Sequence, residues 1–181
     1  MEIPIKDLPL YNRDFDADYP PSGKALKEAI ASVDAVLFVT PEYNSDIRGS
    51  LKNAIDWASR PWGTNSFAHK PSAVLGASPG KIGTAVAQQN LRSVLSYCDS
   101  PQMGAPEAYI QLTPGLITGD GQVTEESTEK FLKRFHGSVR SLHRPGAHRP
   151  PTRQLTFARR ACCPNHVRRR PLPSSGPRNN G

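Results

Sequence analysis

The sequence predicts an α/β fold in which a parallel β-sheet lies between two layers of helices. Short, continuous apolar runs occupy residues 35–39, 72–75 and 109–112. Continuous rather than alternating apolarity is typical of strands that are buried on both faces, as in a parallel sheet. The stretches between these runs carry apolar residues at helical spacing. This alternation of strands and helices indicates βαβ units and therefore a three-layer sandwich.

The boundaries of each predicted strand follow from its neighbours. Residues 35–39 contain two valines and are followed by Pro41, and residues 72–75 run into a glycine-containing segment, 76–80. Residues 109–112 are the third predicted strand. Residues 3–5, Ile-Pro-Ile, are expected to be the end of a further strand that is cut short.

Four stripes of apolar residues at helical spacing predict four helices. The stripes are Leu26, Ala29, Ile30 and Val33; Leu51, Ala54, Ile55 and Ala58; Ala87, Leu91, Val94 and Leu95; and Phe131, Leu132 and Phe135. Pro21 precedes the first stripe and Ser50 is a candidate cap for the second. Thr124 is a candidate cap for the fourth, because acidic residues of a first helical turn follow it.

Charge and composition divide the chain into residues 1–138 and residues 139–181. Residues 1–139 carry 13 basic against 16 acidic residues, whereas residues 140–181 contain ten arginines and no acidic residue. The formal net charge of +7 therefore belongs to the last part. That part holds seven prolines and shows no apolar period. We expect it to be a disordered tail, because it buries too little apolar surface to offset its chain entropy.

The sequence argues against four features: a membrane span, an export leader, a disulfide framework and a metal site. No run of 18 apolar residues is present, so we expect no membrane-spanning helix. The first residues lack a basic and apolar leader, so the cytoplasm is the expected compartment. The three cysteines, Cys98, Cys162 and Cys163, do not suggest a disulfide framework. With the histidines they show no metal-ligand spacing, and we expect no metal site.

The first candidate binding segment is Thr40-Pro41-Glu42-Tyr43-Asn44, directly after the best predicted strand. In open α/β sheets, ligands bind at the carboxyl ends of the strands. Pro41 fixes the chain direction, Tyr43 offers a flat face, and the Asn44 side chain with the loop amides can meet the edge of a heteroaromatic ring. The alternative is a plain strand-to-helix turn, because turns favour the same residue types.

The second candidate segment, residues 76–84, follows the next predicted strand. Its glycines allow close approach of the backbone to a ligand, and amides that open the next helix suit an electron-rich edge. Neither common glycine-rich nucleotide fingerprint is present, so a structural turn is again the alternative. Adjacent parallel strands would bring both segments to one edge of the sheet, and this favours a cleft over two unrelated turns.

Two stretches resemble the NADPH-dependent FMN reductase family. PEYNSDIRGSLKNAIDWASR (41–60) is similar to the family pattern P-E-Y-N-x-S-x-P-G-x-L-K-N-A-I-D-W, and KPSAVLGASPGKIGTAVAQQNLRSVL (70–95) is similar to the second family signature. The resemblance runs from about Asp7 to Phe135. It implies a flavodoxin-like fold, FMN held without a covalent link, NADPH as co-substrate, a small-molecule electron acceptor such as a flavin or quinone, and a homodimer or homotetramer.

The resemblance also assigns residues. Pro41, Glu42, Tyr43 and Asn44 would border the flavin ring; Ser78, Gly80 and Lys81 would lie near its pyrimidine edge; and Gly83 and Thr84 would shape the same loop. None of them need be an acid, a base or a nucleophile, because the cofactor carries the chemistry. No catalytic side chain is therefore expected.

The chain departs from the family pattern at both ends. The family begins with a strand and a loop of the form G-S-x-R-x-x-S-x-N around the FMN phosphate, and we expect this first strand and phosphate loop to be missing. Their loss would weaken FMN binding by orders of magnitude. After residue 138 the sequence is expected to be divergent or frameshifted.

Two other interpretations stay open. The chain is an inactive remnant of the family if the two loops do not bind flavin without the phosphate loop. A nucleic-acid-binding protein is the weaker alternative: ten arginines in the tail can neutralise phosphates. The tail contains one aromatic residue, Phe157, so it offers no series of base-stacking platforms.

Overall fold

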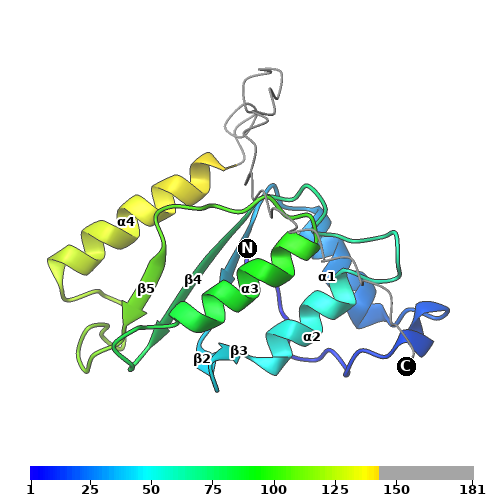
Figure 1. The fold of residues 1–181 in the computed structure, drawn as a ribbon, viewed down its shortest axis with the longest axis horizontal. Helices are drawn as coiled ribbons and strands as arrows, with labels where there is room; N and C mark the ends of the chain where they lie inside the picture. Colours follow the sequence, from blue (N-terminus) through cyan, green and yellow to red (C-terminus); the bar gives the residue numbers. More distant parts are fainter. Residues whose placement is uncertain (143–181) are drawn as a thin grey trace, which may run out of the picture. The chain divides into compact units, whose positions relative to one another are not determined.

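The computed structural model describes residues 1–142 and contains a three-stranded parallel sheet. The strands are β1 (Val36–Val39), β4 (Ser72–Ser78) and β5 (Ala108–Gln111), in the order β1-β4-β5 (Figure 1). Val36 pairs with Ser72, and Leu75 pairs with Ala108. The predicted parallel α/β fold is confirmed, with each strand within a few residues of its expected bounds.

Helices cover the sheet on both faces (Figure 1). The helices α1 (Pro21–Ala31), α2 (Gly49–Ala58) and α3 (Ala85–Tyr97) lie on one side, and α4 (Glu126–Ser141) lies on the other. A short 3₁₀ helix, η1 (Arg13–Asp16), precedes α1. Two strands of two residues each, β2 (Glu42–Tyr43) and β3 (Asp46–Ile47), form a separate antiparallel hairpin.

The core is split by the sheet, as a strand period of two requires. Phe38 and Val74 point into the larger cluster with α1, α2 and α3, whereas Ala73 packs with Phe135 and Leu142 of the α4 side. β1 is less completely covered than β4. Leu37 and Val39 are 41% and 63% exposed. A cavity of about 570 Å³ borders β1, α1, α2 and residues 1–5.

Trp57 of α2 holds the first 20 residues against the helical layer through a hydrogen bond and aromatic contacts. The indole is fully buried, and its Nε1 donates to the Pro9 carbonyl at 2.7 Å. The rings of Tyr11 and Tyr19 stand edge-on to it, with centroids 5.1 and 5.0 Å away. Residues 3–5, expected as a strand end, are not a strand: Pro4 has no N–H for a ladder, and Ile3 and Ile5 pack against the core instead.

Three boundary predictions need correction. α2 begins at Gly49 after Arg48, so Ser50 lies inside the helix and is not its cap. The N-cap of α4 is Glu125, while the Thr124 hydroxyl donates to the Gly115 carbonyl at 2.8 Å. α1 ends at Ala31, so Val33 lies beyond it.

The far end of the folded part lies slightly later than expected. α4 extends to Ser141 and Leu142 is buried, so the boundary that we expected after residue 138 falls within the last turn of this helix. The remainder of the arginine-rich tail lies outside the described residues. Within residues 1–142 the helices are all too short or too polar to span a bilayer.

Candidate functional site

Both candidate segments lie at the carboxyl edge of the sheet. Pro41 follows the end of β1, and Pro79 follows the end of β4. Because β1 and β4 are parallel neighbours, their ends point in one direction (Figure 1). The expected juxtaposition of the two segments is therefore present.

The first segment folds as the β2–β3 hairpin. Asn44 and Ser45 occupy its turn, with φ of 53° and 60°. Two consecutive residues of positive φ define the type I′ turn, whose twist matches that of the strands it joins. Tyr43 is 56% exposed, and the Arg48 guanidinium lies 5.4 Å from the centre of its ring. The hairpin thus presents a tyrosine face and an asparagine side chain to solvent.

Glu42 directs its carboxylate to α3. Its Oε2 accepts the backbone N–H of Ala87 at 2.9 Å. Farther along the helix, Asn90 Nδ2 donates to the Ser45 carbonyl at 3.1 Å and to Asp46 Oδ1 at 3.3 Å. The hairpin is therefore attached to α3 at two points.

The second segment forms a tight loop between β4 and α3. The Ser78 hydroxyl accepts the Gly80 N–H at 3.2 Å, and the Gly83 N–H donates to the Gly80 carbonyl at 3.0 Å. Lys81 is exposed at the tip. Gly83 has a φ of +60°, and a Cβ there would lie 2.9 Å from the Tyr109 carbonyl carbon. Glycine is required at this position for both reasons.

The buried side chains of Thr84 and Gln88 hold this loop against the sheet. Thr84 and Gln88 are fully buried, and Gln88 Nε2 donates to the Thr84 hydroxyl at 2.8 Å and to the Ala108 carbonyl at 2.7 Å. A Cβ on Gly76 would lie 2.1 Å from Thr84 Oγ1 and 2.4 Å from the Thr40 carbonyl oxygen. At Gly76, β4 therefore packs tightly against Thr84 at the start of α3 and against Thr40 after β1.

The sequence indicated no role at the site for Gln88, Ala87 or Asn90, and Ala87 was expected only as part of an apolar helical stripe. One signal was present for Gln88: it is a polar residue inside an apolar stripe, four positions after a threonine. The amide of Ala87 and the side chain of Asn90 gave no such signal, because their partners lie about 45 positions away.

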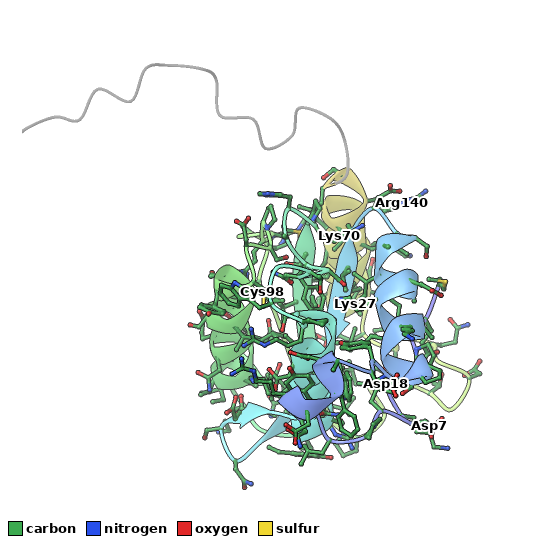
Figure 2. The ribbon with its side chains drawn as sticks, turned by 90° about the vertical axis from the view of Figure 1, so that its right-hand side faces the viewer. Asp7, Asp18, Lys27, Lys70, Cys98 and Arg140 are labelled. Carbon is green, nitrogen blue, oxygen red and sulfur yellow. The ribbon has the colours of Figure 1, made fainter. Side chains whose placement is uncertain are left out.

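The described residues offer little other reactive chemistry. Within residues 1–142, no three His, Cys, Asp or Glu side chains are grouped as metal ligands would be. Cys98 is buried at the end of α3 (Figure 2), and burial raises the pKa of its thiol. Lys27 of α1, also labelled in Figure 2, donates hydrogen bonds from its ammonium group to the Arg60 and Thr64 carbonyls at 2.5 and 2.6 Å. Cys162 and Cys163 lie outside the described residues.

Comparison with known proteins gives consistent matches. The sequence model for NADPH-dependent FMN reductase matches residues 1–114. A 2-hydroxy-1,4-benzoquinone reductase from Burkholderia is 47% identical over 133 residues, which is 74% of this chain and 73% of that protein. A quinone reductase from Pseudomonas putida is 45% identical over 134 residues, covering 74% and 72% of the two chains.

The fold gives the same answer. The flavoenzyme NAD(P)H:(acceptor) oxidoreductase FerB from Paracoccus denitrificans superposes with a TM-score of 0.75 and 48% identity over 78% of each chain. The chain therefore belongs to the NADPH-dependent FMN reductase family.

Proposed function

We propose that this protein uses FMN to pass reducing equivalents from NAD(P)H to a quinone-type acceptor. The observation that carries the proposal is the pair of loops, residues 41–44 and 78–84, at one edge of a parallel sheet in a chain of this family. The quinone class is supported by the relatives, which are named quinone reductases. When bound, FMN supplies the two-electron chemistry, and the protein supplies binding and orientation.

The described residues fit the ring of the cofactor better than its phosphate. Gly83 is packed against β5 and Gly76 against Thr84, so the loop above them is held with its backbone close to the sheet edge. Such a loop suits a flat ligand that meets backbone amides. A phosphate needs several converging donors. The two loops carry one cationic side chain, Lys81, and we assign these residues to the ring alone.

Each proposed ring-binding residue has a physical role. Tyr43 and Asn44, on the exposed hairpin, would meet the ring with a flat face and an amide, and Pro41 sets the direction in which the chain leaves β1. On the other loop, Ser78, Gly80 and Lys81 would approach the pyrimidine edge. The Lys81 ammonium is exposed at the tip and suits negative charge there.

The remaining three proposed site residues shape the loops and do not contact the ring with their side chains. Gly83 and Thr84 are buried, so they shape the loop and do not reach a ligand with side chains. Glu42 has its carboxylate on α3, so only its backbone is free to border the ring.

Assembly and compartment are further proposals. We propose a homodimer or homotetramer that works in the cytoplasm, supported by the resemblance of the sequence to the family. Light scattering coupled to size-exclusion chromatography tests the assembly: a monomer at micromolar concentration would contradict it.

Flavin titration tests the function. The full chain is purified and titrated with FMN while flavin fluorescence is followed, and NADPH and a benzoquinone are then added. Saturable quenching at micromolar FMN, followed by NADPH-dependent loss of quinone absorbance, supports the proposal. Folded protein that leaves FMN fluorescence unchanged would mean that these loops do not suffice, and that the chain is an inactive member of its family.

A further inference from the structure

In the first turn of α3, the N–H of Ala87 receives its acceptor from a distant part of the chain. The first N–H groups of a helix have no partner within it. The N-cap residue of α3, Thr84, makes no capping bond with its side chain, because its hydroxyl accepts from Gln88 instead. Glu42, 45 positions before Ala87, fills this role with a carboxylate oxygen 2.9 Å from the Ala87 nitrogen.

This bond joins the two loops of the candidate site. Glu42 opens the hairpin that carries Tyr43 and Asn44, and α3 continues directly from the loop of residues 78–84. A carboxylate near a helix N-terminus also interacts favourably with the partial positive charge there. The contacts of Asn90 hold the hairpin turn one helical turn farther on, so the tie at Glu42 is the one nearest the loop.

We propose that Glu42 is a positioning residue, which holds the two loops at the spacing that a flavin ring requires through its bond to α3. The inference rests on the proposed function, because it concerns the same ring-binding loops. A ligand that bridges both loops binds only the fraction of molecules in which they are correctly spaced. Its apparent dissociation constant rises as that fraction falls.

Three variants separate positioning from other roles. Glu42→Ala removes the acceptor. Glu42→Gln keeps an acceptor oxygen of the same reach and removes the charge. Ser100→Ala is the matched control, because the buried Ser100 hydroxyl bonds to the Lys70 carbonyl at 2.7 Å and to the Ser72 hydroxyl at 2.8 Å, at the opposite end of β4.

Three measurements are made on each variant. Amide hydrogen exchange is measured without flavin, on peptides that cover residues 40–48 and 79–90. FMN affinity is then measured by fluorescence titration, and the reduction potential of bound FMN by dye equilibration. For Glu42→Ala we expect about tenfold faster exchange in both peptides and about tenfold weaker FMN binding, which corresponds to ~1.4 kcal/mol.

The other two variants are expected to behave differently. Glu42→Gln keeps exchange and affinity within about threefold of the wild type, and the loss of a negative charge near the ring makes the potential more positive. Ser100→Ala lowers the melting temperature and leaves FMN affinity unchanged.

Several results would overturn the inference. Unchanged exchange in Glu42→Ala means that the tie does not hold the loops. Faster exchange with unchanged FMN affinity means that Glu42 stabilises the fold and nothing more. Weak binding by Glu42→Gln with slow exchange means that the carboxylate touches the ligand. A wild type that does not bind FMN refutes the proposed function, and with it the flavin role of Glu42, while the exchange data still report on the tie itself.

Discussion

Replacement of Gly76 by alanine is expected to disrupt the candidate site, because it displaces residues that pack against the loop of residues 78–84. Gly76 is in β4 and contacts Thr40 and Thr84, and Thr84 is in turn hydrogen-bonded to the buried Gln88. An added Cβ would lie 2.1 Å from Thr84 Oγ1 and 2.4 Å from the Thr40 carbonyl oxygen, and carbon and oxygen atoms do not approach this closely. One of the two neighbours must therefore move.

The expected cost follows from which neighbour moves. The Thr40 carbonyl is backbone and belongs to the end of β1, so the easier movement is that of the Thr84 side chain. Rotation of Thr84 breaks its hydrogen bond with Gln88 and leaves a buried amide donor with a single partner. Overpacking costs about 1–3 kcal/mol, and a weakened buried hydrogen bond adds about 1 kcal/mol. We expect a total loss of about 2–4 kcal/mol.

Urea denaturation with a matched glycine measures this loss. Gly49→Ala is the control, because the first residue of α2 has no atom within 4 Å of an added Cβ. That variant is expected to be as stable as the wild type or up to about 1 kcal/mol more stable. A Gly76→Ala variant with the same urea midpoint as Gly49→Ala would refute the close contact between β4, Thr40 and Thr84.

Three further predictions concern stability and solubility. Trp57→Phe should lower the free energy of unfolding by about 1–3 kcal/mol in urea denaturation, because the Pro9 carbonyl keeps only the Asn53 amide of its two side-chain donors and the smaller ring fills less of the core; an unchanged midpoint would contradict this. Burial raises the pKa of Tyr19 to about 12 from 10.0, so the stability linked to its neutral phenol is present below pH 10 and is lost as the pH rises toward 12. Tyr19→Phe should therefore show a flatter decline in urea midpoint over that range than the wild type, and a parallel decline would count against the assignment. Val39→Lys, at a 63% exposed position, should change stability by less than about 0.5 kcal/mol and reduce light scattering on concentration, whereas Phe38→Lys should prevent folding.

The central strand of the sheet could be predicted from the sequence because β4 is buried on both faces. Burial forces continuous apolar runs, and those runs are short enough to distinguish from helices. Residues 72–75 were found for this reason, whereas residues 35–39 were found because they form an apolar run, although Leu37 and Val39 are exposed. Residues 3–5 are also apolar, but Pro4 removes a ladder donor, and the segment packs as irregular chain.

The hairpin at residues 42–47 could not be predicted in the same way. Its strands have two residues each, and no periodicity can be read from so few. The segment is fixed by contacts with α3 through Glu42 and Asn90, which join positions about 45 residues apart. Local sequence therefore predicted a loop where tertiary contacts produce a hairpin.

The place of the candidate site was predictable, but its supports were not. Parallel topology alone brings the segments after β1 and β4 to one edge. The inward-facing group of Gly76, Thr84 and Gln88 depends on side-chain packing between β4 and α3, for which a single sequence gives no direct signal.

The pairing of the sheet also sets an order of events during synthesis. Val36 of β1 cannot pair until Ser72, 36 positions later, has been synthesised, and Leu75 of β4 cannot pair until Ala108, 33 positions later, has been synthesised. At translation rates of about 5–20 residues per second, the apolar segment Val-Leu-Phe-Val therefore stays without its partner for roughly 2–7 s after it is made. By the end of that interval α1 and α2 are the only α-helices yet synthesised, so their mutual packing is the first apolar surface that can cover Phe38 in the nascent chain.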